Sequence, residues 1–289
     1  MRPPFLLLPI AMMILVAGLA TYDGYDWSME LFLLILLGAV ASNISVNMLN
    51  EYEDAESGLD DMTECTPFSG GSGSLQQNPE AQQLVGKLGY FFLGLVISLG
   101  VFFVYLRGWE IIPIGLLGAF LIAFYTSNIT RMPWMCLVVP GLAFGPLMVI
   151  GGYFVLTGSL GWTAVLVSVI PFFLVNNLLL LNQFPDEAAD KQVGRRNIIM
   201  KLGRKNASLI FISFALLSFI TLAYLMVDGW LPYWAGLGFL PLLLALPMIG
   251  KVKSHYNDMV ALMPALGMNV GVNILVPSLI GIGLMLSSP

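Results

Sequence analysis

Long apolar runs are the feature that most constrains how this chain can fold. Runs of roughly 18 or more predominantly apolar residues recur along the 289-residue sequence, and each can cross ~30 Å of hydrocarbon as a helix. Hydrophobic residues make up 58% of the chain and charged residues only 10%, a balance that is unusual for a soluble domain. The runs predict about nine transmembrane spans, at about residues 4 to 20, 29 to 49, 85 to 106, 110 to 126, 133 to 156, 161 to 181, 207 to 227, 230 to 249 and 262 to 286.

The predicted fold is therefore an all-α polytopic membrane protein, a bundle of about nine helices around a central cavity. We expect a single domain over residues 1–289, because only two polar stretches, at about 51–83 and 183–205, are longer than short connections. These two stretches should carry the chemistry. The first apolar run follows Arg2 and resembles a signal peptide, but it is long for that role. We expect it to be retained as the first helix.

The distribution of Lys and Arg predicts the orientation of the chain. With the N-terminus in the cytoplasm, nearly all basic residues fall on the cytoplasmic side and only Arg107 falls outside. The C-terminus then lies outside, and both polar stretches lie in the cytoplasm. We expect a multi-pass protein of the cell membrane that contacts the lipid bilayer and no nucleic acid, with its active site on the cytoplasmic side. Cys65 and Cys136 fall on or near the cytoplasmic side, where disulfides are rare, and neither belongs to a motif. We expect both to be structural.

A polar stripe leads into the densest run of acids, residues 50 to 64. Four polar residues follow one another at intervals of four, three and four, namely Asn43, Asn47, Asn50 and Asp54. This spacing places them on one face of a helix. Lipid penalises such a stripe, so we expect it to face the bundle interior or a hydrated cavity. Hydrogen bonding between helices is the simpler interpretation of the asparagines, but the stripe continues into acids, which favours a functional site.

The same arrangement occurs a second time. Asn50-Glu-Tyr52-Glu-Asp54 has a counterpart in Asn182-Gln-Phe184-Pro-Asp186, and a second acid follows each copy, Asp60 and Asp190 respectively. Asp186 and Asp190 share one face of a helical turn, whereas the first pair needs an intervening bend, for which Gly58 is suited. Solvated loop acids would explain one such run but not two matched copies. We expect the two acid pairs to converge across one cavity.

Converging carboxylates repel unless a cation lies between them. Hard oxygen ligands without His or Cys favour Mg²⁺, which commonly completes its shell with substrate phosphates, so the implied substrate is a diphosphate. Basic residues near the acids are candidates for holding the remaining phosphate oxygens, namely Arg131, Lys191, Arg195 and Arg196. Membrane topology or lipid headgroups explain Arg195 and Arg196 better. Tyr125 suits an interfacial aromatic belt.

These motifs resemble the UbiA superfamily of intramembrane prenyltransferases, and most of all its menaquinone branch, the dihydroxynaphthoate prenyltransferases. The resemblance covers nearly the whole chain. It rests on a first motif of Asn47, Asn50, Glu51, Tyr52, Asp54, Gly58 and Asp60, and on a second motif of Asp186, Asp190, Lys191, Gly194 and residues 201–203. Tyr125, Thr126 and Arg131 resemble the connection between the fourth and fifth helices, which supplies a basic phosphate contact in that family. Glu51 stands where Asp is usual, and residues 65–71 lack the arginines that many members carry.

The resemblance implies Mg²⁺-dependent transfer of a polyprenyl group from a polyprenyl diphosphate to an aromatic acceptor of the quinone-precursor type. Departure of the diphosphate would leave an allylic carbocation, which the acceptor ring attacks. The implied catalytic residues are Asp54, Asp186 and Asp190. The implied metal ligands are Asn50, Glu51, Asp54, Asp60, Asp186 and Asp190. The expected substrate contacts are Asn47, Asn50, Tyr52, Tyr125, Arg131, Asn182 and Lys191.

Three other interpretations remain open at this point. A cation-coupled secondary transporter would also have buried asparagines and acids, although its site usually lies near the middle of the bilayer, at broken helices within inverted repeats. Here both motifs end spans on the same side, four spans apart. A scaffold protein would explain the hydrophobicity but not the matched acids. A prenyltransferase with a non-aromatic acceptor, such as a glycerol phosphate lipid precursor, would need other residues in the cavity.

Overall fold

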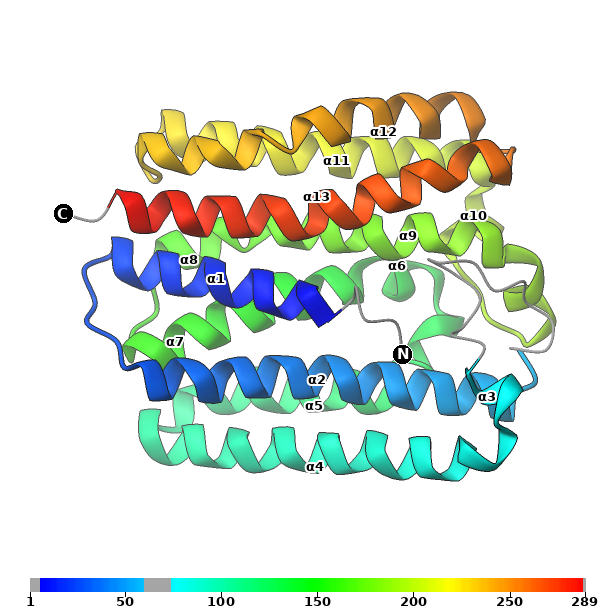
Figure 1. The fold of residues 1–289 in the computed structure, drawn as a ribbon, viewed down its shortest axis with the longest axis horizontal. Coiled ribbons are helices and arrows are strands. Elements are labelled where there is room, and N and C mark those ends of the chain that lie inside the picture. Colours follow the sequence, from blue (N-terminus) through cyan, green and yellow to red (C-terminus); the bar gives the residue numbers. More distant parts are fainter. Residues whose placement is uncertain (1–5, 60–73, 288–289) are drawn as a thin grey trace.

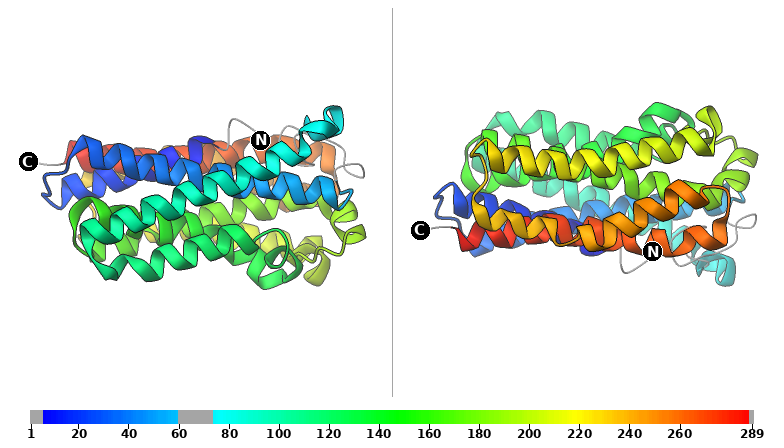
Figure 2. Two further views of the ribbon diagram at one scale, coloured as in Figure 1. Left: turned by 90° about the horizontal axis from the view of Figure 1, so that it is seen from below. Right: turned by 90° about the horizontal axis from the view of Figure 1, so that it is seen from above.

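The computed structural model describes residues 6–59 and 74–287, and every regular element within these residues is a helix. The long helices lie side by side along one axis (Figure 1), and Figure 2 shows the same common axis from two further directions. The α-helices are α1 (Leu7–Tyr22), α2 (Met29–Glu56), α3 (Ser74–Gln77), α4 (Gln82–Arg107), α5 (Ile112–Phe124), α6 (Pro133–Leu142), α7 (Gly151–Thr157), α8 (Trp162–Val167), α9 (Val169–Gln192), α10 (Ile198–Leu202), α11 (Arg204–Val227), α12 (Leu242–His255) and α13 (Met259–Leu286). Tighter or wider helical turns join some of them, namely η3 (Pro79–Ala81), η4 (Trp109–Ile111), η5 (Ile129–Arg131), η6 (Ala143–Ile150) and η7 (Tyr233–Phe239).

Each predicted apolar run coincides with a helical segment. Within the described residues, seven segments are long and apolar enough to cross a membrane: Met29–Glu56, Pro79–Arg107, Pro133–Thr157, Trp162–Gln192, Arg204–Val227, Tyr233–His255 and Met259–Leu286. The two other predicted spans correspond to shorter apolar helices, Leu7–Tyr22 and Trp109–Phe124. The all-helical fold is confirmed, whereas the number of nine spans stays a prediction.

The first helix packs in the core of the bundle. Figure 1 shows α1 between α13 and α2, and both helices contact it. A Cβ atom added to Gly18 would stand 2.3 Å from the backbone oxygen of Gly281, so the backbones of α1 and α13 meet directly at this point. Met12, Leu15 and their apolar neighbours on α1 are fully buried. The predicted first helix therefore forms part of the fold.

The two ends of the bundle carry different polar groups. α4 ends at Arg107, at the end of the bundle opposite α3 and α10 (Figure 1). The Arg107 guanidinium donates to the backbone oxygens of Val155 and Leu156 at the C-terminus of α7, at 2.7 and 3.0 Å. These carbonyls would otherwise lack partners at a helix end. The side of the membrane on which each end lies stays a prediction.

The span that crosses the bundle as α6, η6 and α7 departs from regular α-helix geometry. Pro140 and Pro146 lie within it, and each removes one backbone donor. The turns of η6 are π-helical, a wider form that is frequently found at functional sites. A Cβ added to Gly141 would stand 2.1 Å from the backbone oxygen of Phe172, so α6 packs closely against α9. This contact fixes one wall of the cavity described next.

Candidate active site

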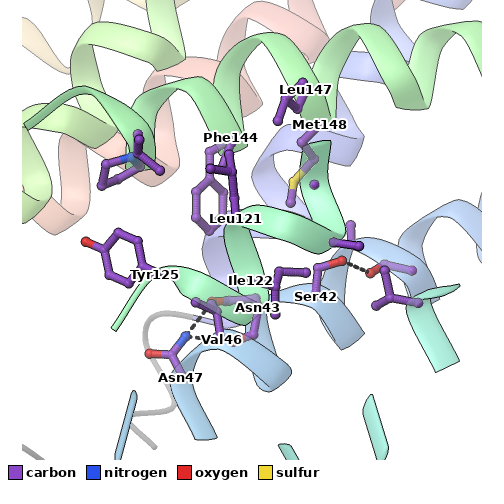
Figure 3. A pocket seen from close by; sticks show the side chains of 18 of the residues that line it. Ser42, Asn43, Val46, Asn47, Leu121, Ile122, Tyr125, Phe144, Leu147 and Met148 are labelled. Atoms are coloured by element: carbon purple, nitrogen blue, oxygen red, sulfur yellow. Dashed lines mark hydrogen bonds between the residues drawn. The ribbon is translucent and has the colours of Figure 1, made fainter. Parts of the chain in front are cut away.

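A cavity of about 760 Å³ lies between α2, α4, α5, α6, η6 and α9. Figure 3 looks into it, with Asn43, Val46 and Asn47 of α2 across from Phe144 and Met148 of η6. Along α2 the cavity extends from Ile35 to Asp54, which are 19 positions apart. A helix rises 1.5 Å per residue, so the cavity is about 28 Å long. It is apolar at the Ile35 end and polar at the Asp54 end.

The polar end of α2 lies on one face of the helix, as the spacing predicts. The cavity is lined by Asn43, Asn47, Asn50, Glu51 and Asp54. The amide of Asn47 donates to the backbone oxygen and side-chain oxygen of Asn43, at 2.7 and 2.6 Å. One turn further on, Asn50 donates to Oδ2 of Asp54 at 2.7 Å and accepts from Thr126 at 3.2 Å. These bonds hold the side chains in place along the wall of the cavity.

Helix α9 supplies a second polar wall. Three residues at intervals of four line the cavity, namely Asn182, Asp186 and Asp190. Asn182 Oδ1 is buried and lacks a hydrogen-bond partner among the described residues. Gln183, also on this wall, donates to the Cys136 sulfur at 3.1 Å. The second acidic motif therefore shares a cavity with the first. We expect a ligand to donate a hydrogen bond to Asn182 Oδ1.

Arg195 joins the two motifs directly. Its guanidinium forms an ion pair with Oδ1 of Asp54 and a second one with Oδ1 of Asp190 at 3.4 Å. The Arg195 side chain is 16% exposed, and the two carboxylates are less exposed still. Asn197 donates to the other oxygen of Asp190 at 3.3 Å. The acids of α2 and α9 thus meet through a shared cation, as expected of converging carboxylates.

Local backbone structure explains how Arg195 reaches the acids. α9 ends at Gln192, and Gly194 follows with φ +80°, a left-handed conformation that favours glycine. The backbone then turns back, so that Arg195 N–H donates to the Asp190 carbonyl at 3.0 Å. Burial opposes the charge of the guanidinium, but Asp54 and Asp190 outweigh that cost, and the pKa of Arg195 is raised above its ordinary value. Arg195 therefore stays positively charged.

Several predicted contacts lie away from the cavity. Tyr52 packs against Gly86 of α4, and it is not among the residues that line the cavity. Its counterpart Phe184 is fully buried in the core. Both aromatic residues stand two positions after an asparagine that faces the cavity, which turns them about 200° around the helix. Lys191 and Arg131 are exposed and do not line the cavity either.

The remaining predicted residues divide between the cavity and the undescribed part of the chain. Tyr125 lines the cavity and packs against the small apolar cluster of Leu121, Ile129 and Val139. Asp60 lies outside the described residues, as do residues 65–71. α2 ends at Glu56, and Gly58 has φ +72°, so the chain turns at the glycine that the sequence indicates.

The donor types of this site suit Mg²⁺, which prefers carboxylate and amide oxygens. The described part of the cavity wall carries four acids, Glu51, Asp54, Asp186 and Asp190, and a single basic residue, Arg195. In residues 6–59 and 74–287, no three His, Cys, Asp or Glu side chains are gathered closely enough to hold a metal ion. The guanidinium itself lies between Asp54 and Asp190. The residues thus fit a magnesium ion in chemistry, although a guanidinium lies between two of them in this structure.

Sequence reasoning missed two features of this site. It assigned Arg195 to topology, because the positive-inside pattern accounts for any basic residue in that segment. The signal that the sequence offered for Arg195 was Gly194 directly before it and Asp190 five positions earlier. It also treated Cys136 as structural only, although Cys136 lines the cavity. A lone cysteine gives no signal of that kind from sequence.

Comparison with known proteins agrees with the geometry of the site. The model of the UbiA prenyltransferase family matches residues 6–263, which is most of the chain. The chain belongs to the UbiA prenyltransferase family. It is therefore a prenyltransferase, and the resemblance seen in its motifs is confirmed. A relative, the 1,4-dihydroxy-2-naphthoate octaprenyltransferase of Bacillus subtilis (strain 168), is 28% identical over 214 residues, which cover 73% of this chain and 67% of the relative.

Solved structures of UbiA homologues share the fold. The apo structure of a UbiA homologue from Aeropyrum pernix K1 superimposes with a TM-score of 0.69 at 14% identity, over 96% of this chain and 97% of that one. The structure of a UbiA homologue from Archaeoglobus fulgidus bound to GPP and Mg²⁺ gives a TM-score of 0.64 at 15% identity, over 98% of both chains. At these identities the likeness concerns the fold alone.

Proposed function

We propose that this chain transfers a polyprenyl group from a polyprenyl diphosphate to an aromatic acceptor within the membrane, and that the reaction depends on Mg²⁺. The observation that carries the proposal is the meeting of two acidic helices, α2 and α9, at the polar end of a long cavity that is otherwise apolar. The apolar part suits a polyprenyl tail, which water does not dissolve. The acidic part suits a metal-bound diphosphate.

Residues of both motifs would hold the metal, namely Asn50, Glu51, Asp54, Asp186 and Asp190, together with Asp60 from the undescribed segment. Bound Mg²⁺ supplies Lewis-acid stabilisation of the negative charge that develops on the departing diphosphate. The Archaeoglobus fulgidus homologue was solved with GPP and Mg²⁺, which supports a magnesium requirement here by family relationship.

The protein residues have separate tasks in the proposed reaction. Asn50 orients Asp54 through its hydrogen bond, and Asn197 orients Asp190 in the same way. Apolar residues such as Phe144 and Leu147 keep water from the allylic carbocation left when the C–O bond breaks. The acceptor ring then forms a new C–C bond, and a carboxylate of the site or the departed diphosphate takes the ring proton. Tyr125 lines this region and offers an aromatic face to the cation.

The polar stripe favours an aromatic acceptor with polar substituents. Asn43 and Asn47 extend the polar wall two to three turns beyond Asp54, further than a diphosphate group reaches. An acceptor ring that carries hydroxyl or carboxylate groups would use these amides as hydrogen-bond partners. The Bacillus subtilis relative is named for a dihydroxynaphthoate acceptor, which agrees with this chemistry. A naphthoate of the menaquinone type is therefore the proposed acceptor class.

A phosphate-bearing acceptor is less well supported. A second phosphate would need its own cation, and Arg195 is the only Lys or Arg among the described residues that line the cavity. The exposed Arg131 and Lys191 remain candidates for contact with the diphosphate from outside the described cavity. We place the site on the cytoplasmic side of the cell membrane, following the distribution of basic residues. Membership of an enzyme family argues against the transporter interpretation.

Release of pyrophosphate by the purified protein in nanodiscs tests the proposal. The assay supplies a prenyl diphosphate of about 20 carbons or more, a length that suits the ~28 Å cavity. It is run with and without Mg²⁺, and with a panel of acceptors that includes hydroxynaphthoates, hydroxybenzoates and glycerol phosphate. We expect release only when Mg²⁺ and an aromatic acceptor are both present. Release that requires glycerol phosphate would refute the acceptor class. Release that is unaffected by EDTA would refute the role of the metal.

A further inference from the structure

Arg195 is the feature of the site that the proposed reaction leaves unexplained. A guanidinium that only held phosphate would be expected at the rim, where Lys191 lies exposed. Instead Arg195 is inserted between the two acidic motifs and bonds to both, Asp54 and Asp190. It is also the only Lys or Arg among the described lining residues. The charge balance of the described cavity therefore depends on where this one side chain lies.

The carboxylates that Arg195 contacts have all their oxygens engaged. Asp54 accepts from Arg195 on one oxygen and from Asn50 on the other. Asp190 accepts from Arg195 on one oxygen and from Asn197 on the other. A metal ion needs these same oxygens, and a guanidinium and a divalent cation cannot occupy the same space between them. A metal held by both Asp54 and Asp190 therefore has to displace Arg195.

The surroundings of Arg195 allow its side chain to move while its backbone stays fixed. Its N–H is bonded to the Asp190 carbonyl, and the next N–H, that of Arg196, is bonded to the Thr130 carbonyl. Arg195 lies between α9 and α10 rather than within either helix. Rotation of its side chain therefore breaks no backbone hydrogen bond of either helix. A diphosphate bound beside the acids would offer the displaced guanidinium a new anionic partner of suitable fork geometry.

We propose that Arg195 is an internal counter-ion that competes with the metal for Asp54 and Asp190 and passes to the diphosphate when metal and diphosphate bind together. This inference rests on the proposed function. It predicts that the metal alone binds weakly, because it has to leave a buried guanidinium without a partner. It also predicts that the diphosphate favours metal binding, because the same side chain that opposes the metal then stabilises the diphosphate. The two ligands are thus coupled through one residue.

Metal binding to the purified full-length protein tests this inference with a readout separate from catalysis. Isothermal titration measures the affinity for Mn²⁺ alone, and then for inorganic pyrophosphate at saturating Mn²⁺. In Arg195→Gln we expect Mn²⁺ alone to bind about 5- to 150-fold more tightly, the usual range of coupling between two sites. We expect pyrophosphate to bind more weakly in the same variant. Opposite changes are the signature of a shared counter-ion, since general damage to the site weakens both.

Arg196→Gln is the matched control, because Arg196 is the exposed neighbour and does not line the cavity. It should leave both affinities unchanged. Arg195→Lys keeps the charge but cannot span two carboxylates as a guanidinium does, so its affinity for Mn²⁺ alone should lie between those of wild type and Arg195→Gln. This variant serves if Arg195→Gln fails to fold. Thermal unfolding gives a second readout, since Mn²⁺ alone should stabilise either Arg195 variant more than the wild type.

The outcomes separate this inference from the proposed function. If the wild type binds pyrophosphate with Mn²⁺, but the Arg195 variants bind Mn²⁺ alone no more tightly than the wild type, the counter-ion role is refuted and the metal site stands. If the wild type binds neither Mn²⁺ nor pyrophosphate in its presence, the proposed function fails and the counter-ion role fails with it.

Discussion

Replacing Ser42 with phenylalanine should shorten the longest prenyl chain that the enzyme accepts. Ser42 lines the cavity 12 positions before Asp54 on α2, so it stands about 18 Å from the acids along the helix. The whole cavity is about 28 Å long by the same measure. An extended isoprene unit has four bonds of about 1.5 Å in a zigzag and covers roughly 5 Å. The phenylalanine ring should therefore reduce the space from about five or six units to about three.

The magnitude follows from the cost of overfilling a packed cavity. Forcing extra carbon atoms into such a space costs about 1–3 kcal/mol, which lowers kcat/KM by roughly 5- to 150-fold. We expect this loss for diphosphates of four or more isoprene units and no loss for two. The assay compares kcat/KM across a series of chain lengths at saturating acceptor.

Ser98→Phe is the matched control. Ser98 on α4 makes the same bond as Ser42, from its hydroxyl to the backbone oxygen four residues earlier at 2.8 Å, but it is exposed and does not line the cavity. This variant should keep the wild-type profile. An unchanged profile in Ser42→Phe would mean that the tail leaves the cavity sideways before it reaches Ser42, and the reasoning from cavity length would be wrong.

Three further predictions concern single residues. Asp186→Asn should lower kcat by about a thousandfold, because loss of one charge about 4 Å from a cation costs ~4 kcal/mol at an effective dielectric constant of about 20. Glu187→Gln removes only the partly exposed ion pair with Arg204, so it should keep near-normal turnover. Gly281→Leu should lower the melting temperature in detergent strongly and reduce the unfolding free energy by about 3 kcal/mol, because its Cβ would stand 2.5 Å from a backbone oxygen of α1. Gly250→Leu should leave the melting temperature unchanged, because a Cβ at Gly250 meets open space. Arg107→Gln should cost about 1.5–3 kcal/mol in unfolding free energy through its lost bonds to α7 and leave kcat/KM unchanged. Equal activity of the two acid variants, equal melting temperatures of the two glycine variants, or a loss of kcat/KM in Arg107→Gln would each contradict the structure.

The sequence predicts the polar wall of α2 well, because helical periodicity is a local property. Asn43, Asn47 and Asn50 lie on one face for that reason alone. The meeting of α2 and α9 is a long-range feature, and it was predictable only because the motif occurs twice. The same periodicity argues against Tyr52 as a substrate contact, since a residue two positions from Asn50 points away from it.

The roles of the buried asparagines could not be separated from sequence. Asn176 and Asn177 lie on α9, close to Asn182 in the chain, yet they do not line the cavity. Asn176 accepts from the backbone of Gly141 at 2.6 Å, and Asn177 donates to the carbonyl of Phe211 at 2.8 Å. These two side chains join helices, whereas Asn182 faces the cavity. The difference depends on which neighbour each helix face meets, and this packing is set by the whole bundle.

The glycine contact between α1 and α13 also bears on how the protein is made. Gly18 and Gly281 are 263 positions apart, so the ribosome has to add that many residues after Gly18 before the two can meet. At about 5–20 residues per second, α1 waits roughly 10–50 s in the membrane for its partner. Until then, the face of α1 that α13 later covers contacts only lipid or helices that are synthesised before α13. Helix α1 is thus synthesised long before it reaches its final packing, and truncation before α13 should expose it to quality-control proteases.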